Sequence, residues 1–164
     1  LIDRKNPFLF IEYAKKIPIK CKFLIVGNGP LLKSLKEKIK KEKINNVKII
    51  GFKNQVEIAN YYKLCDFLFL PSKYETWGLV VNEAFAMNKP CIVTNKCGSR
   101  KDLIDDFKTG VIIKTYYTNS SLNKILNLIK LNSPKFKKNI EKKNKLYSIT
   151  HSFSAIEKNL KWEI

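Results

Sequence analysis

The sequence predicts an α/β protein with a doubly wound parallel sheet. Short apolar runs alternate along the chain with longer segments whose apolar residues recur at helical spacing. Several of these runs stop at a glycine or a proline, as strands do where a turn follows. Strands and helices that alternate in this way form right-handed βαβ units, which build a parallel sheet with helices on both faces.

The apolar runs predict strands over residues 22–26, 47–50, 66–70, 90–94 and 111–114. The run at 66–70 is rich in aromatic residues and is stopped by Pro71 and Ser72, which is typical of a fully buried parallel strand. In an open α/β sheet, ligands bind beyond the carboxyl ends of the strands. The loops that follow these strands are therefore the expected site.

Helical spacing predicts helices over residues 7–17, 31–43, 55–64 and 79–88. A helical C-terminal part is expected over about residues 119–164, comprising an apolar-faced helix, a lysine-rich helix at 135–145 and a last helix at 153–162. The chain of 164 residues has the length of one domain. We expect residues 1–164 to form a single Rossmann-like domain with extra C-terminal helices.

The formal charge of +18 rests on thirty lysines and only two arginines, in a chain also rich in Asn and Ile. This bias extends over the whole composition, so it favours a solvated lysine-rich surface over a dedicated basic patch. Specific nucleic-acid readout favours arginine and interleaved aromatic residues, so we expect no specific nucleic-acid partner. Attraction of the lysines to an anionic membrane surface stays open.

No apolar run has the length of a membrane-spanning helix, and the start at Leu1 is neither a signal peptide nor an initiator methionine. We therefore expect a soluble, truncated chain that is cytoplasmic, with peripheral contact at the inner face of the membrane as an open alternative. The four cysteines form no C-x-x-C pair and fit reduced thiols.

The most informative motif is a pair of carboxylates, Glu75 and Glu83, eight positions apart. Glu75 is expected on the loop after the strand at 66–70, and Glu83 in the helix that begins near Gly78. Carboxylates can each accept hydrogen bonds from vicinal hydroxyls, and a helix start offers unpaired amides to a phosphate. The alternative interpretation is that both glutamates only complement the helix dipole.

Together with its flanks, this segment resembles the E-x7-E segment of retaining nucleotide-sugar glycosyltransferases of the GT-B fold, in the glycosyl transferases group 1 family. Gly27-Asn28-Gly29-Pro30 resembles the G-x-G-P turn of that family. Five further features match in order: the strand ending at Gly51, the residues Tyr62, Asp66, Pro71 and Ser72, the strand at 90–94, the turn at 98–104, and Gly110. Cys65 stands where alanine is usual. The resemblance covers nearly the whole chain and implies the C-terminal, donor-binding half of a GT-B fold.

The resemblance implies a role for each matching residue. Lys5 would neutralise the diphosphate that departs from the donor, and Glu75 would bind hydroxyls of the transferred sugar; a solvated lysine is the alternative for Lys5. The remaining assignments are to donor binding: Gly27 and Gly29 beside the diphosphate, Gly51, Phe52 and Lys53 toward the base, Gly78, Leu79 and Val80 presenting amides to the phosphates, and Glu83 on the ribose. Simple packing is the alternative for Phe52.

The implied reaction moves a sugar, with retention, from a nucleotide-sugar donor to a glycan or glycolipid acceptor. No D-x-D motif occurs, so we expect no metal and no cofactor. The resemblance implies a UDP- or GDP-linked sugar as the substrate. An N-terminal acceptor domain would be the partner. Two alternatives stay open: a noncatalytic nucleotide-sugar-binding subunit that needs a separate acceptor-domain protein, and another GT-B-like enzyme such as an epimerase or a phosphorylase.

Overall fold

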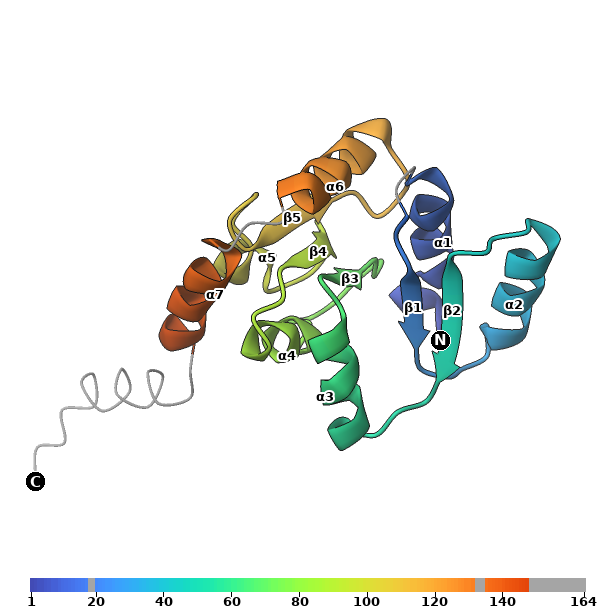
Figure 1. The fold of residues 1–164 in the computed structure, drawn as a ribbon, viewed down its shortest axis with the longest axis horizontal. Helices are drawn as coiled ribbons and strands as arrows, with labels where there is room; N and C mark the ends of the chain where they lie inside the picture. Colours follow the sequence, from blue (N-terminus) through green and yellow to red (C-terminus); the bar gives the residue numbers. More distant parts are fainter. Residues whose placement is uncertain (18–19, 132–134, 148–164) are drawn as a thin grey trace, which may run out of the picture.

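The computed structural model describes residues 1–17, 20–131 and 135–147 (Figure 1). Strands and helices alternate as expected, and the α/β class is confirmed. The elements, in chain order, are a 3₁₀ turn η1 (Asp3–Lys5), α1 (Pro7–Lys16), β1 (Phe23–Val26), α2 (Leu32–Lys41), β2 (Val47–Gly51), α3 (Gln55–Leu64), β3 (Leu68–Leu70), α4 (Val80–Ala86), β4 (Cys91–Thr94), α5 (Arg100–Leu103), β5 (Gly110–Ile113), α6 (Asn119–Leu131) and α7 (Lys135–Leu146).

All strand pairings are parallel, but the strands form two hydrogen-bonded sheets rather than one. β1 pairs with β2, and β3, β4 and β5 form a second sheet in that order. The sequence indicates which segments are strands and cannot fix such pairings. The short elements η1 and α5 were not predicted. β3 begins later than expected, at Leu68, whose amide donates to the carbonyl of Pro90 at the start of the ladder with β4.

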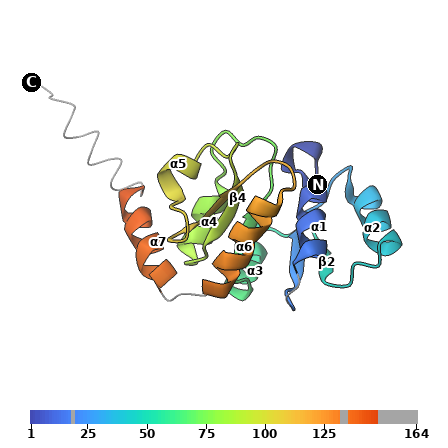
Figure 2. The same cartoon turned by 90° about the horizontal axis from the view of Figure 1, so that it is seen from above.

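α1 joins the two sheets through its aromatic side chains. The ring of Phe10 lies 5.4 Å from Phe23 of β1 and 5.3 Å from Phe69 of β3, measured between centroids. Tyr13, one turn further on, contacts Phe69 at 5.6 Å and Tyr117 at 5.2 Å. Figures 1 and 2 show α1 alongside the β1–β2 pair. This helix therefore belongs to both hydrophobic cores.

Residues at the start of α1 explain its position. Pro7 occupies the first helical turn, where its missing N–H costs nothing. Asn6 precedes it with a left-handed backbone (φ 49°), which asparagine tolerates better than most residues. Its side chain donates to the carbonyl of Thr115, after β5, at 3.1 Å. The helix start is thereby fixed at the carboxyl ends of the strands.

The centre of the larger core is β4, whose four residues are all buried. Val81, Ala84 and Phe85 of α4 pack on the core, as do Ile125 and Leu128 of α6 and Ile140 of α7. Residues 148–164, including the expected last helix and His151, lie outside the described residues. Within the described ranges, no helix is long and apolar enough to cross a membrane.

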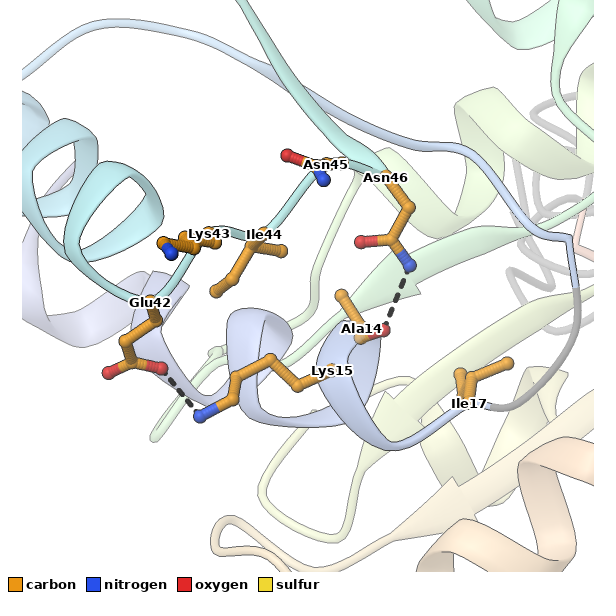
Figure 3. A pocket seen from close by; sticks show the side chains of 8 residues that line it. All are labelled: Ala14, Lys15, Ile17, Glu42, Lys43, Ile44, Asn45 and Asn46. Atoms are coloured by element: carbon orange, nitrogen blue, oxygen red, sulfur yellow. Dashed lines mark hydrogen bonds and ion pairs between the residues drawn. The ribbon is translucent and has the colours of Figure 1, made fainter.

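A cavity of about 270 Å³ lies at the amino-terminal side of β2, away from the strand ends where a ligand is expected (Figure 3). Asn46 donates to the carbonyl of Ala14 there, and Lys15 binds Glu42 at 2.5 Å. Lys38 also binds Glu42, at 2.7 Å, and reaches Glu12 at 3.2 Å. These ion pairs join α1 to α2.

Glu42 makes the α1–α2 contact dependent on pH. Hydrogen bonds from Lys15 and Lys38 lower its pKa to about 2. A lowered carboxyl pKa contributes stability that is present above the unfolded-state value and is lost as the pH falls through the folded-state value. Urea unfolding should therefore show that Glu42→Gln is less stable than the unaltered protein at pH 7, and that the difference disappears toward pH 2. Glu37→Gln, on the exposed side of α2, is the control, and a Glu42 effect independent of pH would contradict the assignment.

Candidate functional site

The loop after β3 is built around a buried carboxylate. Ser72 is fully buried, and Glu75 is only 6% exposed. The Glu75 amide donates to the carbonyl of Lys96 at 3.1 Å, and its carbonyl accepts from the amide of Gly98 at 2.9 Å. Two strand-end loops, after β3 and after β4, are thus hydrogen-bonded side by side, and they hold Glu75 at the carboxyl ends of the strands.

Three groups bind the carboxylate of Glu75. Lys5 donates to Oε1 at 2.5 Å, Ser72 donates to the same oxygen at 2.8 Å, and Arg4 donates to Oε2 at 3.1 Å. Arg4 and Lys5 come from η1, and the carbonyl of Arg4 accepts from the amide of Lys73 at 2.8 Å. The structure therefore brings together the two residues proposed for catalysis, 70 positions apart in the sequence.

The environment of Glu75 keeps it charged. Burial raises the pKa of this carboxyl, but the hydrogen bonds from Lys5 and Ser72 and the charges of Lys5 and Arg4 outweigh burial, so the pKa lies below its usual value. Lys5 is 36% exposed and Arg4 is 46% exposed, so both cations also face solvent. A buried anion under two accessible cations presents net positive charge to an incoming anionic ligand.

The next segment supplies hydrogen-bond donors. Gly78 has a left-handed backbone (φ 91°), and α4 begins two residues later at Val80. Among the described residues, no acceptor binds the amides of Gly78, Leu79 or Val80, although the carbonyl of Gly78 accepts from Val81. Trp77 donates from its ring nitrogen to Asn82 at 2.9 Å and so ties the loop to the helix. Three unpaired amides therefore lie just beyond Glu75 along the chain.

Glu83 lies on α4 with an exposed side chain. Its carboxylate oxygen Oε2 accepts a hydrogen bond of 2.8 Å from the hydroxyl of Tyr62 on α3. No direct contact joins Glu83 to Glu75 among the described residues. The two glutamates of the motif thus occupy separate positions, one buried on the loop and one at the surface of the helix.

The residues predicted around β1 and β2 form a second group. Gly27 and Gly29 follow β1 and Gly51 ends β2, all with positive φ. The amide of Gly27 donates to the carbonyl of Gly51 at 2.7 Å, so these turns lie together. Phe52 is 74% exposed, so its side chain does not pack in the core formed by the described residues. Lys53 donates to Glu57 of α3 at 2.8 Å. Glu57 also forms a capping box with Asn54 at the start of that helix.

Three site residues were missed by sequence reasoning. Arg4 was given no role, because the resemblance points to its neighbour Lys5, and Ser72 was identified only as the residue at which a strand stops. Tyr62 was part of the matching pattern but had no assigned contact, since it lies 21 positions from Glu83. The adjacency of Arg4 to Lys5 was a usable signal, whereas the Tyr62 contact depends on how α3 packs beside α4.

Parallel strands with polar groups gathered beyond their carboxyl ends define the class of α/β domains that bind ligands at this edge. Lys5, Glu75 and the turn at Gly78 all lie there. Within that class, the chain belongs to the glycosyl transferases group 1 family, which it matches over residues 1–147.

Several glycosyltransferases are similar in sequence. An uncharacterized glycosyltransferase of Methanocaldococcus jannaschii is 29% identical over 147 residues, covering 90% of this chain and 40% of the relative. The UDP-Gal:alpha-D-GlcNAc-diphosphoundecaprenol alpha-1,3-galactosyltransferase of Escherichia coli is 31% identical, covering 96% of this chain and 41% of the enzyme. The chain thus spans about two fifths of the length of these relatives.

Solved structures agree on the fold. Anabaena HepE in complex with UDP and glucose superposes with a TM-score of 0.81 at 20% identity, over 96% of this chain and 45% of that one. TarM of S. aureus gives a TM-score of 0.81 at 26% identity, over 96% of this chain and 32% of that one. The expected GT-B-type fold is confirmed.

Proposed function

We propose that this chain is the C-terminal, donor-binding domain of a retaining glycosyltransferase, which moves a sugar from a nucleotide-sugar to a glycan or glycolipid. The observation that carries the proposal is the contact between Lys5 and Glu75 beside the three unpaired amides of Gly78, Leu79 and Val80. Cations and amides suit a diphosphate, and a carboxylate suits sugar hydroxyls. A donor needs both.

In this proposal Lys5 moves from Glu75 to the diphosphate when the donor binds. The freed oxygen of Glu75 then accepts from hydroxyls of the sugar, while Arg4 and Ser72 continue to hold the carboxylate. Stabilising the charge that grows on the leaving phosphate is the main electrostatic task of such a site. Lys5 and the amides after Gly78 would perform it, and the absence of a D-x-D motif supports a mechanism without a metal.

The other assignments complete a donor site along the strand ends. Glu83 would bind the ribose, the turns at Gly27 and Gly29 would lie under the diphosphate, and Gly51 with Phe52 would contact the base. The exposed ring of Phe52 is available for stacking. Lys53 is already paired with Glu57, so it would contact the base only by leaving that partner.

The names of the relatives guide the choice of donor and acceptor. HepE is named in complexes with UDP and UDP-glucose, and the Escherichia coli relative is named for UDP-Gal and a diphosphoundecaprenol-linked sugar. A relative from Acholeplasma laidlawii is an alpha-monoglucosyldiacylglycerol synthase. We therefore place a UDP-linked donor before a GDP-linked one, and a lipid-linked acceptor reached from the cytoplasmic side, at the inner face of the membrane. An N-terminal acceptor domain would complete the cleft.

Glu83→Gln tests the ribose assignment. A glutamine keeps the shape of the side chain but loses the charge that strengthens hydrogen bonds from the ribose hydroxyls. The variant should bind UDP roughly tenfold more weakly than the unaltered protein, as expected for one charged hydrogen bond. Affinity is measured by NMR titration at millimolar UDP. Glu37→Gln, on exposed α2, is the matched control, and equal affinities of all three proteins would contradict the proposed function.

A further inference from the structure

The hydroxyl of Tyr62 joins α3 to α4 through Glu83. Tyr62 is half-buried and packs against the core that surrounds β4, so its ring has a fixed position. From there its hydroxyl reaches across to α4 and donates to Oε2 of Glu83 at 2.8 Å. A side chain anchored in the core therefore holds one that is exposed.

This bond affects what Glu83 can do. An exposed glutamate on a helix samples several rotamers, and ordering it on ligand binding costs conformational entropy. The bond from Tyr62 orders the carboxylate before any ligand arrives and occupies Oε2. The other oxygen, Oε1, keeps its lone pairs for donors such as vicinal hydroxyls.

The proton on Tyr62 stays in place across the physiological range. Burial and the neighbouring charge of Glu83 raise the pKa of this phenol far above its usual value. The hydroxyl is therefore a constant donor to Oε2 of Glu83. Because a carboxylate can only accept hydrogen bonds, the ordered Glu83 suits ligands that donate.

We infer that Tyr62 is a positioning residue that selects ribonucleotides, with free 2′ and 3′ hydroxyls, by holding Glu83 ready to accept from them. The inference rests on the proposed function, because it needs the ribose at Glu83. It adds a residue from α3 that would not touch the donor itself.

The test compares UDP with 2′,3′-dideoxy-UDP, which lacks both hydroxyls. The unaltered protein should prefer UDP. In Tyr62→Phe, affinity for UDP should fall roughly fivefold while affinity for the dideoxy nucleotide stays the same, as expected for loss of one preorganising hydrogen bond. Tyr61→Phe removes the neighbouring hydroxyl on the same helix and should leave the ratio of the two affinities unchanged.

A double variant tests the route of the effect. If Tyr62 acts through Glu83, then Tyr62→Phe should cause no further loss of UDP affinity in the Glu83→Gln background. Amide spectra of each variant establish that it is folded. A loss in Tyr62→Phe that is equal for both nucleotides would show a purely structural role and overturn the inference.

The outcomes also separate this inference from the proposed function. If the unaltered protein binds both nucleotides equally and Glu83→Gln has no effect, the ribose does not lie at Glu83 and both proposals fail. If Glu83→Gln removes the preference for UDP but Tyr62→Phe retains it in full, only the role of Tyr62 is overturned.

Discussion

Lys5→Ala is expected to bind UDP about 10- to 100-fold more weakly than the unaltered protein, the range for a lost charge-assisted hydrogen bond. The reason is that Lys5 is the cation closest to Glu75 and is partly exposed to solvent, so it can turn to a diphosphate. Affinity for uridine, which carries no phosphate, should not change. Titrations of both ligands followed by NMR measure the two affinities.

The Lys5→Ala protein should remain folded, because Arg4 and Ser72 still bind Glu75. Removal of Lys5 will raise the pKa of Glu75, since burial then has less opposition. The stability from this carboxylate will accordingly begin to be lost at a higher pH in the variant. Lys16→Ala, in the last turn of α1, is the matched control. Equal weakening of UDP and uridine would show that Lys5 does not act on the phosphates.

Gly98→Ala is expected to be the most destabilising single methyl addition in the site. A Cβ at position 98 would lie 1.8 Å from the carbonyl oxygen of Thr76, a backbone atom that cannot rotate away. Overpacking of this kind lowers the free energy of unfolding by about 3 kcal/mol. In a protein of this size, that loss lowers the melting temperature by roughly 10 °C. Thermal unfolding followed by circular dichroism measures the shift.

Gly98→Ala should also weaken the binding of UDP. The carbonyl of Glu75 accepts a hydrogen bond from the amide of Gly98, so separating the loops after β3 and β4 also moves Glu75. Gly51→Ala separates contact from backbone strain: its φ is +87° but nothing lies within 4 Å of the added carbon. The free energy of unfolding of Gly51→Ala should fall by about 1 kcal/mol, from backbone strain alone. A melting temperature of Gly98→Ala at or above that of Gly51→Ala would contradict the close-contact explanation.

Much of the fold could be predicted because the strands are short, apolar and bounded by turn residues. β4 shows this clearly: all four of its residues are buried, and the preceding Pro90 marks its start. The start of α1 could also be predicted, from Asn6 and Pro7. The separation into two sheets could not be predicted, because strand pairing depends on contacts between distant segments. Here those contacts are made by an aromatic residue of α1, Phe10, which lies between Phe23 and Phe69.

For the site, the motif predicted where Glu75 and Glu83 lie but not which groups bind them. Arg4, Ser72 and Tyr62 each contact a predicted residue, and only the folded chain brings Arg4 and Tyr62 to it. The pairing of Lys53 with Glu57 follows from helical i, i+4 spacing and could have been seen in the sequence. Local spacing therefore predicts neighbours on one element, whereas contacts between elements need the fold.

The most direct measurement of the central claim is a map of amide chemical shifts as UDP is added to the isotope-labelled protein. Binding at the carboxyl ends of the strands predicts changes at Lys5, at Gly27 and Gly29, and from Gly78 to Glu83. Changes confined to the cavity between Ala14 and Asn46, or no change at millimolar UDP, would contradict the proposed donor site.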